Sequence, residues 1–93
     1  MSTEVRDNET EHRYEILVDG ELAGFAAYRV RPDARAFTHT EVFVEGKGLG
    51  SKLAEGALAD VRAKGGKIVP LCPFIAAYVK RHPEYEDLVA ARD

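Results

Sequence analysis

The segment VFVEGKGLGSKLAEGALADV, residues 42–61, decides the predicted fold because a strand-like pattern changes within it to a helical one. The glycines Gly46, Gly48 and Gly50 alternate at the change. Beyond them, apolar side chains recur at helical spacing, with polar ones on the other side: Leu49, Leu53, Ala54, Ala57, Leu58 and Val61. The segment therefore predicts a strand, a tight turn and an amphipathic helix that ends at residues 65–66.

The glycine turn has the features of an anion site. Glycine lets the backbone approach a ligand closely, and the first amides of a helix have no partner within the helix. The helix dipole adds partial positive charge there, and Lys47 and Lys52 can supplement it for a diphosphate. The spacing fits neither the Walker A pattern nor the dinucleotide fingerprint. A turn that merely redirects the chain also fits.

Before the glycine turn, the sequence predicts three strands. Residues 14–18 and 22–31 alternate around Asp19-Gly20, which indicates a β-hairpin with a tight turn. A proline-containing turn follows, and a third strand runs over residues 36–44.

The N-terminal region lacks such a pattern. Residues 1–11 are polar and charged, without an apolar period, and predict a flexible arm. Residues 12–93 predict one domain, because a chain of 93 residues can bury one core.

After the predicted helix, residues 67–71 form a short expected strand. Pro70 cannot donate a ladder hydrogen bond, so we expect this strand to diverge from a neighbour. Cys72-Pro73 then starts a helix, since proline suits the first helical position, and His82-Pro83 stops it. Residues 84–91 predict a last helical turn or two.

Composition excludes several classes of protein. The net charge of −3 and the pI near 5.6 oppose binding to a nucleic acid backbone. The apolar stretches are too short to cross a bilayer, so we expect no membrane partner. With Cys72 as the single cysteine and a polar beginning in place of a signal segment, the sequence predicts a cytoplasmic protein.

Three separated motifs carry a resemblance to a known family. Residues 45–50, EGKGLG, fit the Q/R-x-x-G-x-G/A pattern of the GCN5-related N-acetyltransferases. FTHTEV at residues 37–42 precedes this turn, while LCPF at 71–74 and HPEY at 82–85 follow it. Together they resemble a subfamily of short acetyltransferase-like proteins with a Cys-Pro-Phe motif, over residues 14–85.

The resemblance implies an α/β (α+β) fold of the order β-β-β-α-β-α, with a mostly antiparallel central sheet, two splayed strands and flanking helices. It also implies acetyl-CoA (coenzyme A) as cosubstrate and no metal. Its pantetheine arm would lie between the splayed strands and its pyrophosphate on the glycine turn. The residues expected to bind it are Val42, Val44, Lys47, Gly48, Leu49, Gly50, Ser51 and Lys52.

The chain departs from the family pattern in two respects. Glu45 replaces the usual arginine or glutamine, which would weaken phosphate binding. The helices that wall the acceptor site in larger relatives have no counterpart, so the acceptor site is expected to be open or completed by another chain.

Cys72 is a candidate nucleophile. It stands at a strand end immediately before a helix, where the dipole stabilises a thiolate, and an acetyl-cysteine intermediate is chemically reasonable. A small buried apolar residue is the alternative interpretation.

Glu41, His39 and Tyr78 are the other candidate catalytic residues. Glu41 and His39 lie two apart on one strand and share a face, so either can accept a proton from an amine. Polar side chains on an exposed strand face are the alternative. The resemblance gives Tyr78 the role of protonating the departing CoA thiolate, against the alternative of aromatic packing. His12, His39 and His82 are scattered and predict no metal site.

Three functions fit the sequence. The first is transfer of acetyl from acetyl-CoA to an unidentified amine, a small molecule or a protein. The second is a CoA-binding or acyl-CoA-binding module without turnover, and the third is a structural interaction domain. A monomer or a weak homodimer is expected.

Overall fold

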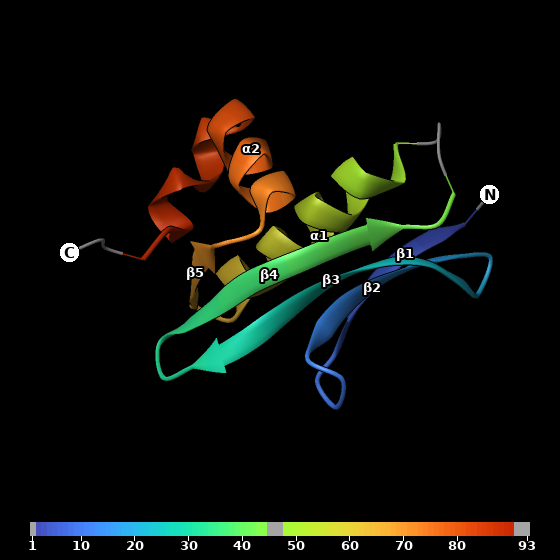
Figure 1. The fold of residues 1–93 in the computed structure, drawn as a ribbon, viewed down its shortest axis with the longest axis horizontal. Coiled ribbons are helices and arrows are strands. Elements are labelled where there is room, and N and C mark those ends of the chain that lie inside the picture. The colour runs from blue at the N-terminus through green and yellow to red at the C-terminus, as the bar shows by residue number, and fades with distance from the viewer. Residues whose placement is uncertain (1, 45–47, 91–93) are drawn as a thin grey trace.

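The structure is a computed structural model that describes residues 2–44 and 48–90. A five-stranded sheet of order β1-β2-β3-β4-β5 carries two α-helices and one 3₁₀ helix (Figure 1). The elements are β1 (Thr3–Asn8), β2 (Arg13–Val18), β3 (Glu21–Arg31), β4 (Ala34–Val42), α1 (Leu49–Ala63), β5 (Lys67–Pro70), α2 (Pro73–Arg81) and η1 (Pro83–Leu88). Strands β1 to β4 pair antiparallel and β5 joins β4 in parallel. The predicted α+β class is confirmed.

The N-terminal segment differs from the prediction. The flexible arm predicted for residues 1–11 is wrong at residues 3–8, which form β1 and pair with β2, so one strand precedes the predicted order. On the side of the helices, Val5 packs closely on α1, because a Cβ at Gly56 would lie 2.7 Å from the Val5 Cβ. Periodicity of apolar residues could not reveal this strand, because its second attachment to the rest of the fold is made by a polar side chain.

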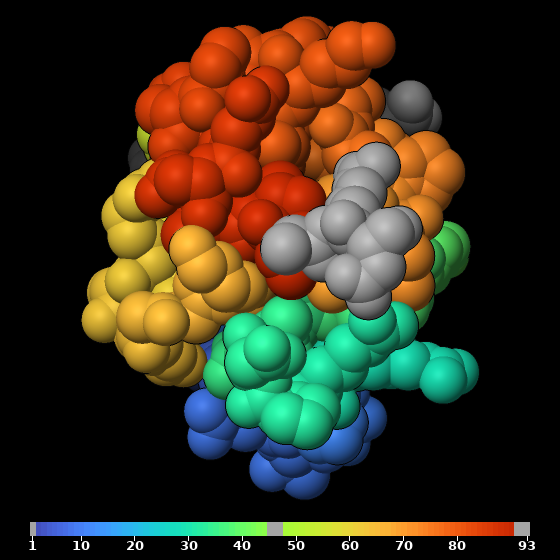
Figure 2. Space-filling view, turned by 90° about the vertical axis from the view of Figure 1, so that its left-hand side faces the viewer, coloured from blue at the N-terminus to red at the C-terminus, as the bar shows by residue number. Residues whose placement is uncertain are grey.

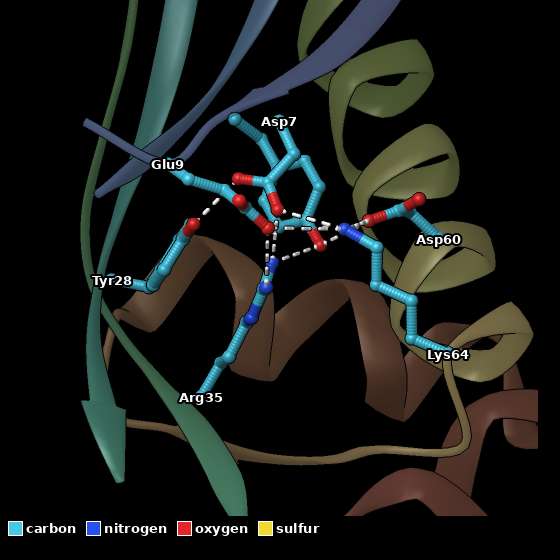
Figure 3. Close-up of polar contacts among 7 residues, drawn as sticks. Asp7, Glu9, Tyr28, Arg35, Asp60 and Lys64 are labelled. Carbon is cyan, nitrogen blue, oxygen red and sulfur yellow. Dashed lines mark hydrogen bonds and ion pairs between the residues drawn. The ribbon is translucent and has the colours of Figure 1, made fainter. Parts of the chain in front are cut away.

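That second attachment is a cluster of charged and hydroxyl groups centred on Asp7 (Figure 3). Arg35 Nη1 donates to Asp7 Oδ2 at 2.5 Å, and Tyr28 donates to Asp7 Oδ1 at 2.5 Å. Lys64, the C-cap residue of α1, donates to Asp7 at 2.9 Å. We call the following residues the polar cluster: Asp7, Tyr14, Tyr28, Arg35, Asp60 and Lys64. It joins β1, β2, β3, β4 and α1.

The hydrogen bonds of the polar cluster outweigh the cost of burial for its carboxylates. Burial raises the pKa of Asp7, but hydrogen bonds from Tyr28, Lys64 and Arg35 bring that pKa below its ordinary value. Burial and a hydrogen bond to Asp60 both raise the pKa of Tyr14. The carboxylates therefore stay charged and the phenols neutral near pH 7.

The core lies between the sheet and α1, with α2 packed beside α1 (Figure 1). The amphipathic pattern is confirmed, since the side chains predicted for the buried face of α1 are all buried. At the C-terminal end, Arg62 of α1 forms an ion pair with Asp87 of η1 at 2.9 Å. Within the described residues, no helix has the length and apolar character needed to cross a membrane.

A bulge in β4 determines which side chains face the helices. The β3–β4 register shifts by one residue at Thr38. Before the shift Phe37 points into the core, and after it Thr40 points to the helices, where it contacts Cys72, the N-cap of α2. His39 and Glu41 lie on the opposite side of the sheet, which we call the open face.

Candidate functional site

Helix α1 begins at the end of the glycine turn. Gly48 is its N-cap with φ 65° and ψ 21°, a left-handed conformation that glycine adopts without strain, and no side chain caps the helix. The first bond within the helix runs from Lys52 N to Gly48 O at 3.2 Å. The amides of Leu49, Gly50 and Ser51 therefore precede the helical ladder and can donate to an anion.

A pocket of about 330 Å³ adjoins this helix start. Most of the predicted cofactor-binding residues line it, with Phe74 added: Val42, Val44, Gly48, Leu49, Gly50, Ser51 and Phe74. Lys47 lies outside the described residues. Lys52 does not line this pocket and instead borders a groove between α1 and β1.

Phe74 was not among the predicted site residues. A Cβ at Gly50 would lie 2.9 Å from Phe74 Cζ, so glycine at this position lets α2 approach the start of α1. The Cys-Pro-Phe motif contained this residue, but its contact with the glycine turn could not be derived from spacing.

Strands β4 and β5 separate before β4 reaches the pocket, as the sequence predicted from Pro70. Their pairing ends at Phe37 and Pro70, and the chain then turns into α2, with Cys72 N donating to Phe37 O at 2.8 Å. Beyond this point no strand of the described residues pairs with this side of β4, which we call its free edge. Phe43 N donates to Ala23 O, so the odd-numbered residues after the bulge form their backbone hydrogen bonds with β3. The backbone amides and carbonyls of the even-numbered residues therefore point to the free edge.

Cys72 lies where the two strands separate. Its side chain is buried, with 3% exposure, and it is the N-cap of α2 with Pro73 in the first turn. Cys72 Sγ is 3.4 Å from Thr40 Oγ1, and either atom can donate. Thr40 was missed as a site residue because the β4 bulge that orients it leaves no signal in the sequence.

His39 and Glu41 form an exposed pair on the open face. His39 Nε2 lies 3.3 Å from Glu41 Oε1, and the side chains are 60% and 50% exposed. The His39 ring lies 6.2 Å from that of Phe25. The structure thus brings these candidate bases together but places them on the opposite face of β4 from Cys72.

Tyr78 is buried on α2, away from the start of that helix. Its ring stacks on His82 at 4.0 Å and lies 6.0 Å from Tyr85. Burial raises its pKa, and the neighbouring Tyr85 and Glu55 add to the shift. Six positions separate it from Cys72, about 9 Å along a helix axis.

Metal ligands are not assembled in the part of the chain that the structure describes. There, no group of three or more His, Cys, Asp or Glu side chains is placed to hold a metal ion.

An uncapped helix start beside two separating strands is the arrangement that the sequence resemblance led us to expect. The family model "GCN5-related N-acetyl-transferase" matches residues 13–88. The chain belongs to the GCN5-related N-acetyltransferase family.

Solved structures share the fold. A GCN5-like protein from Staphylococcus aureus, solved by NMR, has a TM-score of 0.70 and 22% identity over 97% of this chain and 90% of its own. The ribosomal-protein-alanine N-acetyltransferase from Brucella melitensis biovar Abortus 2308 has a TM-score of 0.55 and 25% identity over 87% of this chain. This chain covers 62% of the Brucella protein. No curated protein matched the sequence.

Proposed function

We propose that this protein binds acetyl-CoA at the α1 start and transfers its acetyl group to an amine. The observation that carries the proposal is the pocket at Gly48, which is also lined by Val42 of β4, the strand on which Thr40 contacts Cys72. Acetyl-CoA supplies an acetyl group activated as a thioester.

The residues around the pocket suit the diphosphate and the arm of such a donor. The amides of Leu49, Gly50 and Ser51 would donate to the diphosphate, helped by the dipole of α1. Space for it exists beside Gly48, where an added Cβ would meet nothing within 4 Å. The outward backbone groups of Thr40 and Val42 would pair with the amides of the pantetheine arm.

The acceptor would approach from the open face, where the side chains of His39 and Glu41 are exposed next to the free edge. Glu41 would take a proton from the acceptor ammonium, with His39 as its hydrogen-bonding partner. The freed amine would attack the thioester carbonyl, the carbon–sulfur bond would break, and the CoA thiolate would leave. Tyr78 is proposed to return a proton to that thiolate.

Cys72 offers a second route for the same transfer. Its thiolate would attack the thioester carbonyl and release the CoA thiolate. The amine would then attack the acetyl-cysteine and release the Cys72 thiolate. Its place at the helix start and its contact with Thr40 support this route, while its burial supports a packing role.

Calorimetry with acetyl-CoA tests donor binding. We expect Gly48→Val to abolish saturable binding, because the side chain would strain φ and occupy the ligand space. Gly65→Val is the matched control: Gly65 has φ 72° and open space around it, but lies beyond the other end of α1. Equal affinity in both variants and the wild type would make the glycine turn a structural feature only.

Intact mass and thiol release separate the remaining alternatives. A mass increase of one acetyl group on the wild type, absent in Cys72→Ala, would support the cysteine route. An adduct that persists in Cys72→Ala would contradict it. Release of free CoA with a panel of amines would demonstrate turnover, whereas binding without release would identify a CoA-binding module.

A further inference from the structure

Strand β1 is an edge of the sheet, and its outer side is unpaired among residues 2–44 and 48–90. In Figure 2 the blue N-terminal strands lie at one edge of the molecule, opposite the red and orange C-terminal helices. Its sequence, TEVRDN, contains no proline or glycine, and its register with β2 has no shift. It therefore lacks two of the common features that prevent an edge strand from pairing, a proline and a bulge.

Two backbone hydrogen bonds determine which groups of β1 face outward. Asp19 N donates to Ser2 O at 2.8 Å, and antiparallel bonding alternates, so Glu4 and Arg6 bond to β2. A second bond, from Tyr28 N to His12 O at 2.9 Å, agrees with this. It shows that the even-numbered residues of β2 bond to β3, which leaves the odd-numbered residues of β2 to bond to β1. The amides and carbonyls of Thr3, Val5 and Asp7 therefore point to the free edge.

We infer that β1 pairs antiparallel with β1 of a second copy of this chain, across a two-fold axis at Val5. In this register Val5 lies opposite Val5 of the second copy, and Thr3 lies opposite Asp7. Each of these pairs consists of outward-facing residues, so their amides and carbonyls meet directly. The sheets of the two copies become continuous.

Charge complementarity selects this register and this partner. With the axis at Val5, Glu4 lies opposite Arg6 of the second copy, and Arg6 opposite its Glu4. These are non-hydrogen-bonded pairs, in which side chains approach most closely. An axis at Glu4 would place two glutamates opposite each other, and an axis at Arg6 two arginines.

The side chains concerned are free to form these pairs. Glu4 is exposed, and the Arg6 side chain is 58% exposed, with Nε 3.6 Å from Glu15 Oε1. Arg13 also holds Glu15, at 2.8 Å, so Glu15 keeps a partner when Arg6 turns to the second copy. The contact area of one short strand is small, which predicts a weak dimer at the low end of interface sizes.

Amide hydrogen exchange at two protein concentrations tests the pairing residue by residue. At high concentration we expect slower exchange for the amides of Thr3, Val5 and Asp7. The amides of Glu4 and Arg6, which bond to β2, should exchange at rates that do not depend on concentration. An unchanged Val5 amide under conditions where a dimer forms would overturn the inference.

Charge variants test the register by sedimentation velocity. Glu4→Arg places like charges opposite each other twice in the dimer and should weaken dimerisation on the order of tenfold or more. The double variant Glu4→Arg/Arg6→Glu should recover it. Because Arg6→Glu puts a carboxylate near Glu15, circular dichroism must first show that the double variant folds. Added salt should weaken the wild-type dimer.

Glu21→Arg is the matched control, since Glu21 is an exposed glutamate on β3 and distant from the β1 edge in the sheet order. It should leave dimerisation unchanged. A wild-type chain that stays monomeric throughout the concentration series would overturn the proposal. So would a dimer that weakens as much with Glu21→Arg as with Glu4→Arg.

Discussion

The two ends of α1 meet different environments. At its start, the helix has amides that find no helical partner among the described residues, and they lie beside an open pocket lined mostly by apolar side chains. At its end, Asp60 and Lys64 join the polar cluster, in which charged groups bond to one another. The ends lie about 22 Å apart, given 15 residues and the usual helical rise.

This difference indicates how a small chain can hold a site with unsatisfied groups. The polar cluster fastens β1, β3 and β4 to α1, so the glycine turn does not have to stabilise the fold. We therefore expect substitutions in the polar cluster to change stability and leave ligand binding intact. Substitutions at the helix start should do the reverse.

The largest effect on stability is expected from Arg35→Met. It leaves the carboxylate of Asp7, 8% exposed, without its closest cation, and should lower the free energy of unfolding by about 3 kcal/mol. Urea denaturation measures it. Arg29→Met, at an exposed position of β3, is the control and should have little effect. Equal losses in the two variants would show that the polar cluster is not a stability centre.

Gly56→Ala should have the next largest effect. The new Cβ would come 2.7 Å from the Val5 Cβ, and overpacking of this kind should cost about 1–2 kcal/mol. Exchange of the β1 amides should become faster. Gly66→Ala is the matched control, because its Cβ would meet Val61 at 3.4 Å, an ordinary contact. A fully stable Gly56→Ala variant would mean that Val5 can move freely.

The pH dependence of stability should come from the polar cluster. Hydrogen bonds lower the pKa of Asp7 and Asp60 below 3.8 against the opposing effect of burial, so this stability is present above pH 3.8 and lost as acid protonates the folded carboxylates. Burial raises the pKa of Tyr14 and Tyr28 above 10.0, so their contribution is lost as the pH rises beyond 10.

Thermal melts across the pH range measure both losses of stability, the acid limb below pH 3.8 and the alkaline limb above pH 10. In Tyr28→Phe the alkaline loss should become smaller, while the acid limb should remain because Arg35 and Lys64 still hold Asp7. An unchanged alkaline limb in Tyr14→Phe and Tyr28→Phe would remove the tyrosines from the explanation.

Thr40→Val should cost about 1 kcal/mol or less, because it removes one sulfur–oxygen contact. Its informative effect is on Cys72. Alkylation by iodoacetamide should change in rate if the hydroxyl orients the thiol, and should not change if the contact is packing alone. Thr38→Val, at the bulge on the same strand, is the control.

Glu41→Gln should have the smallest effect on stability, a few tenths of a kcal/mol, since the pair with His39 is exposed. Its effect on acetyl transfer should be much larger, about 100-fold in turnover, if Glu41 takes the proton. Steady-state rates with an accepted amine measure this. Retained turnover would leave Glu41 as a surface residue.

The sequence predicted the parts of the fold that depend on local pattern. The helix after Gly48, the hairpin around Asp19 and the separation at Pro70 all follow from periodicity or from the chemistry of one residue. Strand β1 did not follow, because Asp7 is anchored by Arg35 and Lys64, which are far away in the chain. The contact of Thr40 with Cys72 depends on a bulge that no residue type announces.

The bulge at Thr38 has a consequence for chain length. Arg35 of the polar cluster and Thr40 of the site are five positions apart, so strict alternation would place them on opposite faces of the sheet. The bulge takes up one residue between them, and both side chains therefore point to the helices. Without the bulge, strict alternation through Thr38 would turn Glu41 inward and Thr40 outward. Deleting Thr38 would instead join the regular pairs Phe37–Tyr28 and His39–Ala27 and keep Thr40 on the side of the helices. Related chains should therefore either keep a bulge between Phe37 and Thr40 or lack one residue there.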